Sequence, residues 1–202
     1  MSFLMTKILD LTASIGLYDL WAHHNLKELH DTIIKIANLN GNEQVLDVGC
    51  GTGIFASRLA ETLRESAVHG IDIGPRMIRI SKKRARENDQ KISYRVGTIT
   101  KMPYAKDKFD NVFTCLLFHL LDSSDKELAL MEIYRVLKPE GKYVSVEFEE
   151  YPAGFLRRRT LKYPTGLIRK CGFYIDSEVC GPSVAKRHHT TYRVLLKPGI
   201  CG

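Results

Sequence analysis

The sequence predicts an α/β protein whose strands form one doubly wound sheet. A short apolar run at residues 45–48 ends in three alternating glycines, Gly49, Gly51 and Gly53, and a helix-like pattern follows. Further apolar runs alternate with helical patterns along the chain, which is typical of parallel strands joined by helices. Residues 109–117 are apolar without alternation, as expected for a central strand buried on both faces.

The remaining elements follow from the same patterns. Strands are expected at residues 45–48, 68–73, 92–96, 109–117, 143–148, 172–175 and 191–196. The last two form an antiparallel hairpin with Gly181 and Pro182 in its connection. Residues 143–148 follow a helix that stops at Pro139 and Gly141. We expect one domain over residues 1–202, with helices at residues 1–38 forming a lid and residues 42–197 forming the core.

Composition bounds the kind of protein. A chain of 202 residues suits a single sizeable α/β domain, and no apolar run approaches the ~20 residues of a membrane span. The N-terminus lacks the pattern of a secretory signal. Five cysteines, without Cys-x-x-Cys spacing, favour reduced thiols in the cytoplasm over disulfides or zinc. We therefore expect a cytoplasmic protein without a metal.

The net charge of +7 indicates attraction to anionic partners, which include membrane headgroups, nucleic acid and phosphorylated substrates. Much of this charge lies at residues 76–86 and 157–162. We interpret the first segment as a solvated helix face. Charge by itself does not choose among these partners.

The glycine loop predicts a nucleotide-like ligand. Glycines let the backbone take positive φ and let a ligand approach the main chain at the start of a helix. The dinucleotide fingerprint Gly-x-Gly-x-x-Gly fails because Ile54 takes its last position and Gly53 comes one residue early, which disfavours NAD. Asp47 can order the loop or accept from an ammonium group, and Asp72 can accept from a ribose diol.

With these residues the chain resembles the class I S-adenosylmethionine (SAM) dependent methyltransferases. The resemblance covers about residues 40–150 and rests on Leu46–Gly53, Asp72, Met102-Pro103-Tyr104, Phe109-Asp110-Asn111-Val112 and Arg135–Lys142. Met102-Pro103-Tyr104, Phe118-His119-Leu120 and Val146-Glu147-Phe148 look most like the ubiquinone/menaquinone-biosynthesis and phospholipid N-methyltransferase branches. The resemblance implies a Rossmann-like sheet of order 3-2-1-4-5-7-6 with an antiparallel last strand, SAM as cofactor and S-adenosylhomocysteine as product.

The loop and the resemblance together indicate the cofactor contacts. These are Asp47, Gly49, Cys50, Gly51, Gly53, Asp72, Ile73, Met77, Thr98, Ile99, Cys115 and Leu116. Ile73 and Ile99 are expected to sandwich the adenine ring. Thr98 stands where relatives carry an acidic adenine contact, and its hydroxyl accepts more weakly than a carboxylate. The Cys50 side chain is expected to pack.

Two residues are candidates for catalysis. His119 follows the central strand and either acts as a general base, since imidazole titrates near neutral pH, or shapes the cofactor pocket. Tyr18 either contacts the reacting methyl group or staples the N-terminal helices to the sheet. Glu147 either orients substrate or belongs to a solvated acidic strand end. Catalysis is expected to rest chiefly on alignment, because positioning can supply ~7–11 kcal/mol.

The acceptor stays open between several classes. A soluble small molecule is the first, and an amphiphilic or lipid-linked acceptor, such as a quinone or a phospholipid headgroup at the membrane surface, is the second. The second rests on Phe155 and Leu156 beside the guanidinium groups of residues 157–159, which suit an anionic bilayer. A nucleic-acid or protein methyltransferase is disfavoured, because residues 114–117 lack the Asn/Asp-Pro-Pro-Tyr/Phe motif of base methylation. A SAM-binding protein without transfer activity and the oligomeric state also stay open.

Overall fold

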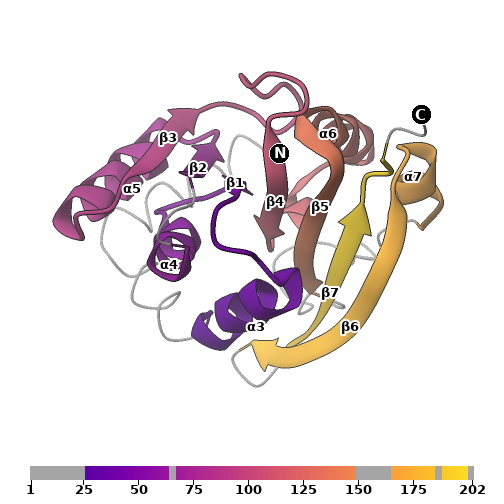
Figure 1. The fold of residues 1–202 in the computed structure, drawn as a ribbon, viewed down its shortest axis with the longest axis horizontal. Coiled ribbons are helices and arrows are strands. Elements are labelled where there is room, and N and C mark those ends of the chain that lie inside the picture. Colours follow the sequence, from indigo (N-terminus) through magenta and orange to yellow (C-terminus); the bar gives the residue numbers. More distant parts are fainter. Residues whose placement is uncertain (1–25, 64–66, 149–164, 185–187, 200–202) are drawn as a thin grey trace.

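The computed structural model describes residues 26–63, 67–148, 165–184 and 188–199 (Figure 1). The elements are α3 (Lys27–Ala37), β1 (Gln44–Val48), α4 (Ile54–Thr62), β2 (Ala67–Asp72), α5 (Pro75–Glu87), β3 (Ile92–Val96), β4 (Phe109–Cys115), η1 (Phe118–Leu120), α6 (Ser123–Val136), β5 (Leu137–Phe148), α7 (Thr165–Lys170), β6 (Tyr174–Val184) and β7 (His188–Leu196).

The strands form a seven-stranded sheet of order β3-β2-β1-β4-β5-β7-β6. Strands β1 to β5 pair in parallel, whereas β7 runs antiparallel to both β5 and β6. The predicted fold class, strand order and antiparallel last strand are therefore confirmed. The order reverses between β1 and β4, and ligands of such sheets bind beyond the carboxyl ends of the strands at this point.

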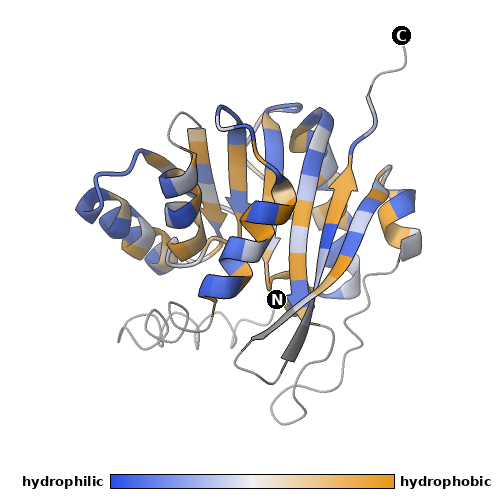
Figure 2. Cartoon of the chain, turned by 60° about the horizontal axis from the view of Figure 1, so that its bottom comes forward, coloured by the Kyte–Doolittle hydropathy of each residue, from blue (hydrophilic) through white to orange (hydrophobic). Residues whose placement is uncertain are grey.

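The core lies on both faces of the sheet because side chains alternate along each strand. In β1, Val45 belongs to the cluster with residues of α3 and α4, whereas Leu46 belongs to the cluster with residues of α6 and α7. In β4, Phe113 and Phe109 divide between the same two clusters. The strands accordingly carry runs of hydrophobic residues, and the helices turn hydrophilic positions outward (Figure 2). This explains why residues 109–115 show no apolar alternation.

Helix α3 corrects the expected extent of the lid. Its residues Leu29, Ile33 and Ala37 are buried and pack in the same cluster as Phe55 of α4. The stripe of apolar residues at spacings of three and four therefore faces the sheet, and α3 is part of the core. The earlier residues of the expected lid, with Tyr18, lie outside the described part of the chain.

Two strand boundaries also differ from the prediction. β5 begins at Leu137, where it pairs with Phe109, so the strand starts at the end of α6 without the expected break. β6 runs through Gly181 and Pro182 to Val184, so these residues lie within the strand and not in its connection. Proline is tolerated there because β6 is an edge strand. Glycine is required at 181 because a Cβ would overlap the Tyr192 ring.

A buried histidine in α3 predicts acid sensitivity of the fold. Burial lowers the pKa of His30 to about 4, and the charge of Arg58 lowers it further, while Asp31 opposes the shift. Since the unfolded state binds the proton more tightly, this stabilisation is complete above about pH 6.5 and is lost as the pH falls toward 4. The loss amounts to roughly 3 kcal/mol at most.

We therefore expect His30→Gln to flatten the acid side of the stability profile. Urea unfolding at pH 7 and at pH 4.5 gives the free energy of unfolding at each pH. Between these two pH values we expect the variant to lose about 2–3 kcal/mol less of this free energy than wild type. Lys35→Gln, at an exposed position of the same helix, is the control. If the stability of wild type and of His30→Gln fell equally between pH 7 and pH 4.5, His30 would not be the source of the acid sensitivity.

Candidate functional site

The loop between β1 and α4 needs glycine at each of its three alternating positions. Gly49, Gly51 and Gly53 have φ values of 74°, 52° and 80°, which lie in the left-handed region. The main-chain N–H groups of Gly49 and Cys50 donate to the carbonyl oxygen of Ile71 at 2.8 and 3.1 Å. The loop is thereby fixed to the end of β2.

The three glycines differ in what surrounds them. A Cβ at Gly49 would lie 2.9 Å from the Leu117 side chain, and one at Gly53 would lie 2.6 Å from the hydroxyl oxygen of Tyr94. At Gly51 no atom lies within 4 Å of the Cβ position. Gly49 and Gly53 therefore serve close packing, and Gly51 faces open space from which a ligand can approach the backbone.

Asp72 joins this loop to the next one. Its carboxylate accepts from the main-chain N–H of Gly51 at 2.9 Å and from that of Gly74 at 2.8 Å. Sequence reasoning assigned this side chain to a ribose diol alone and missed its role in ordering the loop. The ribose contact remains a prediction, and the geometry places the carboxylate beside the open side of Gly51.

Asp47 is a buried acid with an unusual protonation state. Burial raises the pKa of its carboxyl to about 8, the negative charge of Asp72 raises it further, and the main-chain N–H of Ala56 opposes the shift. Its Oδ2 atom finds no hydrogen-bond partner among the described residues. An added cation beside this carboxyl would supply the missing partner, which fits the expected ammonium contact.

The two cysteines at the site are packing residues in this geometry. Cys50 belongs to the core, where its Sγ would lie 3.0 Å from a Cβ at Gly70. This confirms the expected packing of its side chain. Burial raises the pKa of both the Cys50 and the Cys115 thiols, so neither is a thiolate near neutral pH.

The predicted adenine contacts gather at the carboxyl ends of β2 and β3. Ile73 is half exposed beside Asp72, whereas Met77 and Ile99 are buried. The Thr98 hydroxyl lies 3.0 Å from the Thr100 hydroxyl and accepts from the Thr100 main-chain N–H at 3.3 Å. Local bonds thus engage the hydroxyl, and the contacts of these residues with adenine remain predictions.

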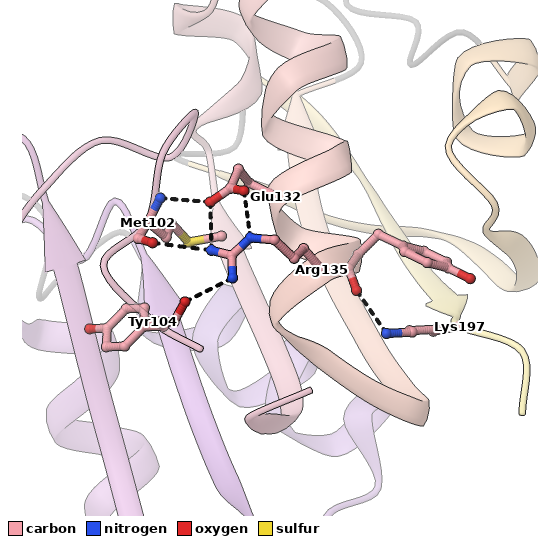
Figure 3. Close-up of polar contacts among 6 residues, drawn as sticks. Met102, Tyr104, Glu132, Arg135 and Lys197 are labelled. Carbon is pink, nitrogen blue, oxygen red and sulfur yellow. Dashed lines mark hydrogen bonds and ion pairs between the residues drawn. The ribbon is translucent and has the colours of Figure 1, made fainter. Parts of the chain in front are cut away.

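An ion pair of α6 fixes the chain that follows Thr98 and Ile99 (Figure 3). Arg135 donates to both carboxylate oxygens of Glu132, at 2.7 and 2.8 Å, and to the carbonyl oxygens of Met102 and Tyr104, at 3.1 and 2.8 Å. Glu132 in turn accepts from the Met102 N–H at 2.7 Å. Sequence reasoning noted Met102, Tyr104 and Arg135 only as parts of a resemblance and missed this contact.

The chain after β4 turns sharply toward β5. Leu116 has a φ of 53°, and its N–H donates to the Val146 carbonyl oxygen at 2.9 Å. His119 follows in η1, with Nδ1 3.1 Å from Oε2 of Glu147. Glu147 is 2% exposed, so its interpretation as part of a solvated strand end is wrong. The predicted site residues of β1, β2, β3 and β4 thus lie at the carboxyl ends of these neighbouring strands.

Several predictions fall elsewhere. Tyr18 and residues 155–159 lie outside the described part of the chain. In the described segments no three His, Cys, Asp or Glu side chains are grouped to hold a metal ion. None of the helices described has the length and apolar character needed to cross a membrane. The outer side of α5 is solvated as expected, with Arg76, Arg79, Lys82, Lys83 and Arg86 exposed.

Comparisons with known proteins identify the kind of domain that this chain contains. Residues 45–141 match a family described as a methyltransferase domain. A ubiquinone/menaquinone biosynthesis C-methyltransferase (UbiE) of Rickettsia prowazekii (strain Madrid E) is 32% identical over 165 residues, which are 79% of this chain and 62% of that protein. The chain therefore spans less than two thirds of the length of this relative.

Solved structures share the fold at lower identity. A chain of the complex between the Haloferax volcanii Trm112 methyltransferase activator and the putative methyltransferase superposes with a TM-score of 0.76 at 17% identity, over 94% of this chain and 97% of that one. The [4+2]-cyclase SpnF gives a TM-score of 0.72 at 24% identity, over 85% and 80% of the two chains. At these identities the structures establish the architecture alone.

Proposed function

Because this chain belongs to the class I SAM-dependent methyltransferases, we propose that it transfers the methyl group of SAM to a small-molecule acceptor by in-line displacement. The observation that carries the proposal is the open side of Gly51, whose N–H bonds to the Asp72 carboxylate, together with the buried Asp47 carboxyl that lies close enough to Asp72 to feel its charge. A flat nucleoside can approach the main chain there, with acceptors for its hydroxyl groups and for a cationic tail.

The residues present fit this cofactor. Asp72 would accept from the ribose hydroxyls, and the buried carboxyl of Asp47 would face the ammonium group, whose positive charge offsets the repulsion from Asp72. Ile73 and Ile99 would hold the adenine ring. When bound, SAM supplies an electrophilic methyl group on its sulfonium. The chain then contributes mainly alignment, which is worth ~7–11 kcal/mol of the barrier.

One observation supports a second candidate for the molecule that accepts the methyl group. The relative from Rickettsia prowazekii is named for ubiquinone and menaquinone biosynthesis and for methylation of carbon. This supports an amphiphilic, quinone-like acceptor that the protein meets at a membrane surface. A soluble small molecule remains the first candidate, since residues 155–159, on which the sequence argument for a membrane surface rests, lie outside the described part of the chain.

Radiolabelled SAM separates these candidates. The protein is incubated with it in the presence of lipid, small-molecule, nucleic-acid and protein fractions of a cell extract. We expect label in the small-molecule or the lipid fraction, in proportion to the protein added. Label in nucleic acid or protein alone would overturn the proposed acceptor class, and no label in any fraction would favour SAM binding without transfer.

Asp72→Ala tests the cofactor site directly. We expect it to weaken the binding of S-adenosylhomocysteine by roughly 1–3 kcal/mol, because the ribose hydroxyls and the Gly51 N–H lose their acceptor. Titration calorimetry measures the affinity, and NAD should not bind. Asp176→Ala, an exposed acid on β6 at the far edge of the sheet, is the matched control. Unchanged affinity in Asp72→Ala would remove Asp72 from the site.

A further inference from the structure

We infer that Glu147 positions His119 as the base that takes a proton from the methyl acceptor, an inference that rests on the proposed function. The two side chains lie at the ends of neighbouring parallel strands. Glu147 lies near the end of β5, and His119 lies just beyond the end of β4. Glu147 is buried, and a charged carboxylate is costly to bury unless hydrogen-bond partners compensate it.

Three hydrogen bonds account for the burial of Glu147. Its Oε1 accepts from the main-chain N–H groups of Leu117 and Phe118, at 3.0 and 2.9 Å. Its Oε2 lies 3.1 Å from Nδ1 of His119. All three partners belong to the short segment after β4, so one side chain orders both the backbone turn and the imidazole ring.

The same bonds decide the tautomer of His119. A carboxylate that already receives two N–H bonds is an acceptor, so the contact at Oε2 requires a proton on Nδ1. In the neutral ring the lone pair then resides on Nε2. Glu147 therefore fixes which nitrogen of His119 acts as the base, and it stabilises the imidazolium that forms when the base is protonated.

The turn also brings the segment that precedes His119 to the proposed cofactor site. Leu116 occupies the left-handed region at φ 53°, a costly conformation for a residue with a side chain and one found at functional sites. The next residue, Leu117, packs against the backbone of Gly49, where a Cβ would approach its side chain to 2.9 Å. The segment that carries His119 thus lies directly against the glycine loop.

This arrangement defines a class of acceptor. An acceptor with an ionisable O–H or C–H, such as a phenol or an enol, gives its proton to Nε2 of His119. The electron pair left on the acceptor attacks the methyl carbon, and the pair of the broken carbon–sulfur bond stays on sulfur. His119 then returns the proton to water. An acceptor that is already anionic, such as a carboxylate, would not need this base.

The tautomer of His119 can be measured without an acceptor. Long-range ¹H–¹⁵N spectra distinguish protonated from unprotonated ring nitrogens, and loss of signals in His119→Gln assigns this ring among the seven histidines. In the neutral ring we expect Nδ1 of His119 to be protonated and Nε2 to be unprotonated. The reverse pattern in the wild-type protein would overturn the inference.

Glu147→Gln tests the role of the carboxylate. The amide introduced by this substitution would keep an oxygen for the main-chain N–H groups but would present N–H to Nδ1, so the two ring nitrogens should exchange their protonation. Glu61→Gln, on the exposed side of α4, should leave the spectrum unchanged. An unchanged tautomer in Glu147→Gln would overturn the positioning role, and if this variant fails to fold the wild-type spectrum still decides.

Binding of S-adenosylhomocysteine to the same wild-type sample separates this inference from the proposed function. Absence of binding would overturn the proposed function and would leave the measured tautomer as a property of the fold. Binding together with Nδ1 protonation supports both. Binding with a proton on Nε2 would leave a SAM site in which His119 does not act as the base.

Discussion

Asp47→Asn is expected to stabilise the ligand-free protein and to weaken its binding of S-adenosylhomocysteine. The carboxyl is 2% exposed, and burial raises its pKa to about 8. Asparagine has nearly the same shape, retains an oxygen for the Ala56 N–H and carries no charge to bury. It removes the negative charge that the ammonium group of the ligand would meet, so affinity falls while stability rises.

The pH dependence of this effect has a defined sign. The folded carboxyl binds a proton more tightly than the unfolded one, whose pKa is near 3.8, so wild type loses stability as the pH rises from about 3.8 to about 8. The variant avoids this loss. The expected gain is up to about 1.5 kcal/mol at pH 5 and up to about 5 kcal/mol at pH 8, where the difference in pKa has its full effect.

Urea unfolding of both proteins at pH 5 and pH 8 checks this prediction, and calorimetry with S-adenosylhomocysteine checks the loss of affinity. Asp176→Asn on β6 is the control for removing one acid from the surface. A variant that is less stable than wild type at pH 8 would show that the Asp47 carboxylate has a stabilising partner. Equal affinity would remove Asp47 from the cofactor site.

Gly51→Ala and Gly53→Ala are expected to fail in different ways. The Gly51 Cβ position is empty, so alanine there costs only the strain of a φ of 52°, roughly 1–2 kcal/mol. The new methyl group would occupy the space that the nucleoside needs, and we expect binding of S-adenosylhomocysteine to weaken on the order of 100-fold, ~2.7 kcal/mol. The fold should persist.

Alanine at Gly53 would overlap neighbouring atoms. Its Cβ would lie 2.6 Å from the hydroxyl oxygen of Tyr94 and 2.8 Å from Cβ of Ser81, in addition to the strain of a φ of 80°. Overpacking and strain together should cost about 2–5 kcal/mol of stability. Thermal unfolding and calorimetry on the pair separate the effects. Wild-type affinity in Gly51→Ala would show that the ligand does not approach this side of the loop.

Local patterns explain how much of this protein could be predicted from its sequence. The strand, loop and helix at residues 44–62 were predicted because the alternating glycines and the apolar spacing carry their own backbone requirements. The buried strand β4 was predicted because a strand covered on both faces shows no alternation. The strand order came from a resemblance, which supplies the pairing that periodicity does not contain.

The predicted strand boundaries were wrong where pairing between strands overrides the local preference of glycine and proline for turns. Leu137 enters β5 because Phe109 offers it a partner, although Pro139 and Gly141 follow. Gly181 and Pro182 are typical of a turn, but β7 pairs with Gly181 and Val184, with a register shift between them, and the edge position removes the usual objection to proline. Helix α3 was assigned to a lid because the spacing of its apolar residues predicts a buried face but does not identify the surface against which that face packs.

The sequence by itself determined the class of the fold and the residues at the carboxyl ends of its parallel strands, because glycine conformations and apolar periodicity act within a few neighbouring residues. Tertiary structure alone decided the environments of the acids. Glu147 is buried because the turn after β4 presents it with three hydrogen-bond partners. The pKa of the Asp47 carboxyl is raised chiefly because the fold buries it, and further because β1 and β2 pair side by side and bring Asp72 near it. Protonation and burial depend on neighbours that only the folded chain brings together.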